Sequence, residues 1–163
     1  MKSKFGIMLA AGAALFLAAC SDDAPEPGAP TDVSSASSID PSSLQYFQQT
    51  VGDRVFFETD SNRLTGVGQQ TLQRQAQWLN QNQGVNAVIE GHADERGTRE
   101  YNLALGARRA EAARSFLIAQ GVAAARLRTI SYGKERPESL CSAENCWSQN
   151  RRAVTVIAGA PTS

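Results

Sequence analysis

The sequence of 163 residues is short of the residue types that most metal sites need, because it has one histidine, His92, and three cysteines. A single histidine excludes zinc motifs of the H-E-x-x-H type, and three cysteines cannot complete a four-cysteine zinc site. Net charge is also lacking, since Lys and Arg together number 16 and so do Asp and Glu. A chain without a basic excess is not expected to bind nucleic acid. The sequence therefore predicts no metal, no cofactor and no nucleic-acid partner.

Long hydrophobic runs are scarce as well, and the only one extends from Phe5 to Ala19, after two lysines. Its 15 residues would span about 22 Å as a helix, less than the roughly 30 Å of a bilayer core. A basic start followed by a short apolar run is typical of an export signal. The final Leu17-Ala18-Ala19-Cys20 resembles the lipobox of bacterial lipoproteins, which implies removal of residues 1–19 and acylation of Cys20. An ordinary signal followed by a chance cysteine is the alternative.

Residues 20–43 are predicted to form a disordered tether that begins at the lipidated cysteine. Between Ser21 and Ser43 the chain holds four of its six prolines, seven serines, five acidic residues and no Lys or Arg. Only Val33 and Ile39 are sizeable hydrophobes, so this segment cannot bury enough apolar surface to offset its chain entropy. By resemblance to enteric lipoproteins, a serine rather than an aspartate after the cysteine implies the outer membrane, with the domain facing the periplasm.

Residues 44–163 alternate between strand and helix patterns and form the predicted folded domain. Two stretches have apolar residues at helical spacing, and four short runs are typical of strands. The expected order is a short helix through Gln49, strand 54–57, helix 65–81, strand 85–90, helix 98–119, strand 127–132, a loop with two cysteines, and strand 153–158. This alternation predicts an α/β (α+β) sandwich in which helices cover one side of a small mixed sheet.

The long helix is predicted to pack on the sheet through Leu103, Ala110 and Leu117, which are seven residues apart. Asn102 and Arg109 have the same spacing. Positions seven apart in a helix are about 20° out of register, so these two residues give a polar strip beside the packing face.

A short loop, residues 91–97, leaves the second strand immediately before this helix. Ligands of open α/β sheets tend to bind at strand-to-helix loops, so Asp94 and Arg109 can present opposite charges to one small zwitterion. Other roles stay open from spacing alone. Asp94 can pair with a nearby arginine, Arg109 can be a solvated surface arginine, and His92 can be a packed residue. Arg96 and its charged neighbours are expected to be a solvated surface.

Four segments carry a resemblance to a known family: residues 89–106, 108–110, 131–135 and 150–154. The first contains Gly91-His92-Ala93-Asp94-Glu95-Arg96-Gly97-Thr98. These segments resemble the peptidoglycan-associated lipoproteins and their OmpA-like peptidoglycan-binding domain, over about residues 54–157, and the lipobox and tether match that arrangement. The resemblance implies an outer-membrane lipoprotein that holds the cell wall non-covalently through the diaminopimelate of its peptide stems. It also implies the Tol system, with TolB and other Tol proteins as partners, in envelope integrity and cell division.

The same resemblance assigns roles to individual residues. The ligand-binding positions of the family are matched by Asp60, Asp94, Asn102, Leu105 and Arg109. Asp94 suits the ammonium at the free end of diaminopimelate, Arg109 suits its carboxylate, and the backbone N–H of Asp60 meets a ligand carboxylate. This chain departs from the family at Thr59, where relatives often have a phenylalanine that forms an apolar wall.

Cys141 and Cys146 are predicted to form a disulfide, because export delivers them to an oxidising compartment. A turn of the four residues between them can close to the Cα separation that a disulfide prefers. A regular helix would point two positions five apart in different directions, so the bridge requires a non-helical turn. Two unbridged thiols, or a zinc site with further ligands, are the alternatives.

A non-enzymatic role is expected. A cell-wall hydrolase would need a nucleophile–base pair, and the only candidates are His92 with a serine or the adjacent Asp94 and Glu95. Neighbours in one loop rarely face each other across a scissile bond. A porin or a flagellar stator component would need a membrane-spanning segment, which residues 20–44 do not offer.

Overall fold

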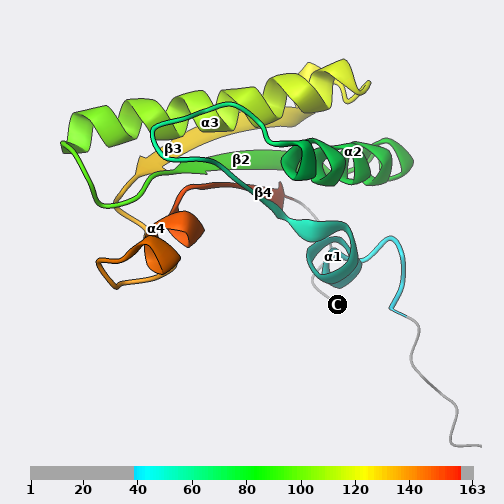
Figure 1. Cartoon of the computed structure of the whole chain (residues 1–163). Coiled ribbons are helices and arrows are strands. Elements are labelled where there is room, and N and C mark those ends of the chain that lie inside the picture. The colour runs from blue at the N-terminus through cyan, green and yellow to red at the C-terminus, as the bar shows by residue number, and fades with distance from the viewer. Residues whose placement is uncertain (1–38, 159–163) are drawn as a thin grey trace, which may run out of the picture. The chain divides into compact units, whose positions relative to one another are not determined.

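The computed structural model describes residues 39–158. The expected signal peptide 1–19, Cys20 and residues 21–38 of the expected tether lie outside the described residues. In the described part, no helix is long and apolar enough to cross a bilayer. The elements in chain order (Figure 1) are α1 (Leu44–Tyr46), the π-helix η1 (Phe47–Gly52), β1 (Arg54–Phe56), α2 (Gly66–Gln81), β2 (Asn86–His92), α3 (Arg99–Ala119), the 3-10 helix η2 (Ala124–Arg126), β3 (Leu127–Gly133), α4 (Glu144–Asn150) and β4 (Arg152–Ala158).

A four-stranded mixed sheet in the order β1-β4-β2-β3 forms one layer of the domain. β4 lies antiparallel to β1 and to β2, whereas β2 and β3 are parallel. α2 and α3 cover one face of the sheet (Figure 1), and the predicted fold class is confirmed. The apolar core between the two layers consists of Phe47, Val51, Val55, Phe57, Leu72, Ala76, Trp78, Leu79, Ala87, Ile89, Ala110, Ala113, Leu117, Val122, Leu127, Ala153 and Ile157.

Both long helices begin at threonine caps. The hydroxyl oxygen of Thr65 accepts a hydrogen bond from the N–H of Gly68 at 3.1 Å, and that of Thr98 accepts one from the N–H of Tyr101 at 3.2 Å. Such caps satisfy backbone donors that have no partner within the helix. The predicted bounds of these helices therefore agree with the structure to within one residue.

Two glycines in close contact determine which face of α3 meets the sheet. A Cβ on Gly91 would lie 1.8 Å from the carbonyl oxygen of Gly106, and a Cβ on Gly106 would lie 2.8 Å from that of Gly91. The prediction that Leu103 belongs to the core is wrong, since it is 48% exposed, whereas Ala110 and Leu117 are fully buried. A seven-residue spacing drifts around a straight helix, and the glycine contact places the later members of the series inward.

The sequence predicts a simple loop between β3 and β4, and this prediction is wrong, because the connection contains α4. This helix has seven residues and no side-chain cap at its start, so it lacks the signals that reveal a helix in a sequence. Tertiary contacts hold it instead. Its last residue, Asn150, is buried, and its side-chain oxygen accepts hydrogen bonds from the N–H groups of Glu138 and Ser139 at 2.7 and 3.0 Å.

The folded domain begins slightly before the expected end of the tether. The indole N–H of Trp78 donates to the carbonyl of Pro41 at 2.7 Å, and the hydroxyl oxygen of Ser43 caps α1. The ring of Phe47 packs on Trp78 with 4.8 Å between centroids. Residues 41–43, which the sequence assigns to a disordered tether, are therefore held against α2.

Candidate functional site

The loop of residues 93–98, between β2 and α3, is fixed by side chains from two other segments. The amide of Asn102, at the end of the first turn of α3, donates to the carbonyl of Arg96 at 2.7 Å. The ammonium of Lys134, just after β3, donates to the carbonyl of Gly97 at 2.8 Å. Because its backbone is held in this way, the loop presents Asp94 in one defined position.

A pocket of about 320 Å³ opens beside this loop. Three segments that are separate in the sequence line it: the chain after β1, the 93–98 loop and the first two turns of α3. The lining residues are Thr59, Asp60, Asp94, Arg96, Gly97, Tyr101, Asn102 and Leu105. The structure thus brings together four of the five residues that the resemblance assigns to ligand binding. The fifth, Arg109, does not line the pocket.

Asp94 is largely buried, with 7% of its surface exposed, and it is paired with two arginines. Nη2 of Arg96 lies 2.6 Å from Oδ2 of Asp94, and Nη1 of Arg151 lies 3.4 Å from the same oxygen. Burial works against the carboxylate, but hydrogen bonds from Arg96 outweigh it, so the pKa of Asp94 lies below its ordinary value. The expectation that Arg96 belongs to a solvated surface is wrong in part, because its guanidinium lines the pocket and covers the carboxylate.

Arg109 is fully buried beneath the chain that follows β1. Its guanidinium donates to three backbone carbonyls: Ser61 at 2.8 Å, His92 at 2.9 Å and Glu58 at 3.1 Å. The same group lies 5.3 Å from the ring centroid of Phe57. Burial lowers the pKa of Arg109 to about 10, still far above neutrality, so the side chain is a buried cation. A solvated surface arginine, the alternative left open by the sequence, is excluded.

Asp60 has an unusual backbone conformation at the mouth of the pocket. Its φ of 53° makes it the only non-glycine residue with a positive φ among residues 39–158. The two carbonyls that bracket it, on either side in the chain, are bound by Arg109, and its carboxylate accepts a hydrogen bond from the hydroxyl of Tyr101. Tyr101 therefore provides an aromatic wall in a pocket where Thr59 supplies no ring.

α4 and Arg151, the residue that follows it, contribute a set of contacts that sequence reasoning missed. Arg151 is almost fully buried, donates to the carbonyl of Phe57 at 3.1 Å and pairs with Glu144 at 2.5 Å. The guanidinium of Arg96 stacks over the ring of Trp147 at 4.3 Å from the centroid. Arg151 and Asp94 are 57 residues apart, so no local pattern could relate them. The only sequence signal was the place of Arg151 in the last segment of the resemblance.

Cys141 and Cys146 are joined by a disulfide, with 5.6 Å between their Cα atoms. Cys141 precedes α4 and Cys146 lies within it, so the chain between them starts as a non-helical turn. The bridge holds the start of α4, which carries Glu144. Its formation in the cell stays a prediction.

His92, the only histidine, is a packed residue. It is buried, its ring stacks on Tyr132 with 5.6 Å between centroids, and its ring nitrogens have no hydrogen-bond partner within residues 39–158. Burial, assisted by the charges of Arg152 and Arg136, lowers its pKa to about 4, so the ring is neutral at pH 7. In the same part of the chain, no three His, Cys, Asp or Glu side chains gather as a metal site would require.

A two-layer α/β sandwich with a small charged pocket at a strand-to-helix loop defines a ligand-binding domain. A family model described as the OmpA family matches residues 56–152. The chain belongs to the OmpA family, as the resemblance of its motifs predicts.

Individual relatives agree with this assignment. A protein of Mesorhizobium japonicum called "Peptidoglycan-associated lipoprotein" is 56% identical over 155 residues, which cover 94% of this chain and 92% of that protein. A protein of the same description from Agrobacterium fabrum is 56% identical over 149 residues, 90% of this chain and 84% of that one. The crystal structure of the peptidoglycan-associated lipoprotein from Burkholderia pseudomallei superposes with a TM-score of 0.68 at 40% identity, and covers 73% of this chain and 100% of its own.

Proposed function

We propose that this protein binds peptidoglycan non-covalently, by holding the diaminopimelate of a peptide stem in the pocket beside Asp94. The observation that supports this most directly is a buried carboxylate at the wall of a pocket of about 320 Å³. One turn beyond the pocket-lining residues of α3 lies a buried cation, Arg109. The free end of diaminopimelate carries one ammonium and one carboxylate, so its charges complement this pair. The names of the relatives, peptidoglycan-associated lipoproteins, support peptidoglycan as the polymer to which the ligand belongs.

Binding of the ammonium to Asp94 requires that Arg96 release the carboxylate. The Arg96 side chain is 41% exposed, so its guanidinium can leave Asp94 and the ring of Trp147 that it covers and turn toward solvent. In this scheme the Arg96 guanidinium takes the place of the ligand cation while the pocket holds no ligand. The ammonium then forms a charge-assisted bond with a carboxylate that is already ionised.

The ligand carboxylate meets the backbone N–H of Asp60, and Arg109 acts on it through its charge, since this side chain is fully buried and does not line the pocket. Because Arg109 already donates three hydrogen bonds, it does not offer an unoccupied fork to the ligand. The main role of Arg109 is therefore to hold the Glu58–Ser61 chain so that Asp60 faces the pocket, and to add positive charge behind it. Asn102 and Leu105 form the floor.

The domain acts as a link between membrane and wall. In this proposal Cys20 is acylated after removal of residues 1–19, residues from 20 to about 40 serve as the tether, and the domain faces the periplasm from the outer membrane. TolB and other Tol proteins are its partners in envelope integrity and cell division. No covalent step is needed, so the protein is not an enzyme. A Cys20→Ala chain should lose labelled fatty acid and leave the membrane fraction, and persistent acylation of that variant would contradict the assignment.

The decisive experiment is co-sedimentation of the chain with purified sacculi, with free meso-diaminopimelate as competitor. Asp94→Asn should lower the affinity by about thirtyfold to a thousandfold, because one charge of the ligand loses its partner. Glu111→Gln, which neutralises an exposed carboxylate of α3 that does not line the pocket, is the matched control and should bind normally. Diaminopentane, which has ammonium groups and no carboxylate, should not compete. Normal binding by the Asp94→Asn chain would refute the site.

A further inference from the structure

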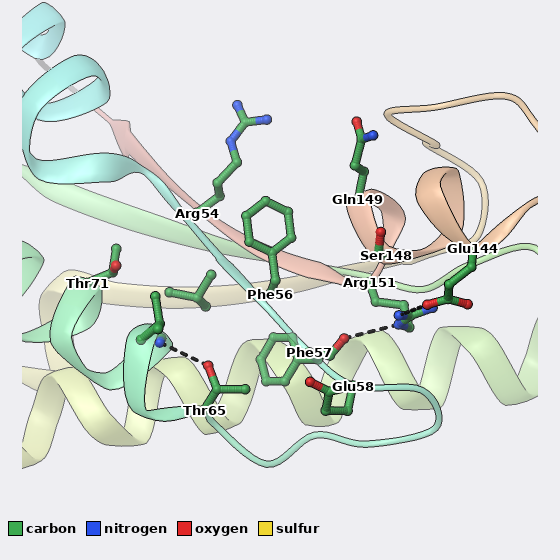
Figure 2. A pocket seen from close by; sticks show the side chains of 13 residues that line it. Arg54, Phe56, Phe57, Glu58, Thr65, Thr71, Glu144, Ser148, Gln149 and Arg151 are labelled. Atoms are coloured by element: carbon green, nitrogen blue, oxygen red, sulfur yellow. Dashed lines mark hydrogen bonds and ion pairs between the residues drawn. The ribbon is translucent and has the colours of Figure 1, made fainter.

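β1 is an edge strand whose outer side faces a large groove. The sheet order places β4 on one side of β1, and no strand of residues 39–158 lies on the other side. The groove has a volume of about 750 Å³ and runs between β1, the first turns of α2, and α4 (Figure 2). None of the residues that line the groove also lines the pocket at Asp94, although Arg151 of the groove pairs with Asp94.

The hydrogen-bond pattern shows which backbone groups of β1 face the groove. The N–H of Phe57 donates to the carbonyl of Arg151 at 2.9 Å, and the carbonyl of Asp53 accepts from the N–H of Thr155 at 2.7 Å. In an antiparallel pair, alternate residues bond to the partner strand and the residues between them point away. Asp53, Val55 and Phe57 therefore pair with the segment of β4, and the N–H and C=O groups of Arg54 and Phe56 point outward.

The walls of the groove offer apolar surface on both sides of this edge. Phe56 is 45% exposed and Val67, in the first turn of α2, is 74% exposed. Figure 2 shows Phe56 between the strand and α4, with Ser148 and Gln149 across from it. A strand laid along β1 would direct alternate side chains toward Val67 on one face and toward Phe56 on the other. An extended polypeptide has N–H and C=O groups along its edge and side chains on alternating faces. It can therefore bond to the outward-pointing backbone groups of β1 and place apolar side chains on both sides of the strand.

We infer that this groove is a docking site for an extended segment of a partner protein, which pairs with β1 and extends the sheet by one strand. Backbone hydrogen bonds to Arg54 and Phe56 supply the register, and apolar side chains at alternate positions fill the sites beside Phe56 and Val67. The site requires neither Asp94 nor Arg109, so it can be occupied while the pocket holds its own ligand.

The first measurement is a selection of short random peptides, displayed on phage, against the full chain in detergent micelles. Peptides with apolar residues at alternate positions should be enriched. The best peptide, labelled with fluorescein, is then titrated by fluorescence anisotropy. Val67→Lys places a charge in the groove and should abolish binding, whereas Val156→Lys, at an exposed valine of β4 that does not line the groove, should leave it unchanged. Both variants should still sediment with sacculi, which separates this inference from the proposed function.

The second measurement tests backbone pairing directly. Each residue of the selected peptide is N-methylated in turn, which removes one N–H donor. Positions whose N–H faces β1 should each lose about tenfold in affinity, and the positions between them should lose little. Equal losses at all positions, or peptides whose binding ignores Val67→Lys, would overturn the inference. A dimer in analytical ultracentrifugation that Val67→Lys disrupts would assign the groove to a second copy instead, and would equally overturn it.

Discussion

Replacement of Arg109 by alanine should destabilise the domain strongly, although the residue belongs to the proposed ligand site. The side chain is fully buried and donates three hydrogen bonds to the carbonyls of Glu58, Ser61 and His92. Each bond from a charged donor is worth about 1.5–3 kcal/mol, but three bonds from one group are not additive. Arg109→Ala leaves three backbone carbonyls without this donor, and each unsatisfied buried polar group costs about 1–3 kcal/mol, so we expect the free energy of unfolding to fall by about 3–5 kcal/mol.

Urea unfolding, followed by tryptophan fluorescence, measures this change. The matched control is Arg108→Ala, which removes the same chemical group one residue earlier from an exposed position and should change the free energy by less than about 0.5 kcal/mol. Arg109→Lys keeps the charge but not the planar fork, and should lie between alanine and wild type. If the free energy of unfolding of Arg109→Ala lies within about 1 kcal/mol of wild type, Arg109 has little structural role and does not hold the Glu58–Ser61 chain in place.

Three further predictions concern the rest of the fold. Gly106→Ala should lower the free energy of unfolding by about 1–3 kcal/mol, because its Cβ would meet the Gly91 carbonyl. The control is Gly66→Ala, whose added Cβ would meet no other part of residues 39–158 within 4 Å and which should be near neutral in the same urea assay. Acidification from about pH 6.5 to about pH 4 should lower the free energy of unfolding by up to about 3 kcal/mol, because the unfolded chain binds a proton on His92 at a higher pH than the folded chain does. A His92→Gln chain should lack this part of the pH dependence. An NMR titration in which the single imidazole of the folded protein titrates near pH 6.5 would contradict this prediction. Maleimide should label neither Cys141 nor Cys146 in denatured, unreduced protein from periplasm, and reduction should cost only about 2 kcal/mol, since the closed loop is short.

Local signals were sufficient to predict most of the fold. Thr65 and Thr98 accept hydrogen bonds from residues three positions later, so the starts of α2 and α3 can be predicted from residues that are close in the sequence. α4 escaped prediction because its stability depends on contacts with distant segments, and neither a cap nor an apolar period marks it. The inward direction of α3 depends on Gly91 and Gly106, which contact each other through space, and the periodicity of the helix alone pointed to Leu103.

The candidate site was predictable only as a set of residues. The family resemblance identified four residues that the structure gathers at one pocket: Asp60, Asp94, Asn102 and Leu105. The partners that decide their behaviour could not be predicted, because the contacts of Arg109 are backbone carbonyls, which every residue possesses. Arg96 was misjudged for a similar reason, since its ring partner Trp147 belongs to the helix that the sequence did not reveal.

The attachment of residues 41–43 to α2 has a mechanical consequence. A force applied to the amino-terminal side of the chain enters the domain near Pro41, whose carbonyl is held by Trp78, and passes next to the ring contact of Phe47. These contacts lie in series with the load and involve no ladder of the sheet, so they should yield one after another. The first extension of a pulled molecule would therefore release α1 and η1, while β2, α3 and the loop at Asp94 remain assembled. The start of the domain would therefore lengthen under tension before the pocket at Asp94 is disturbed.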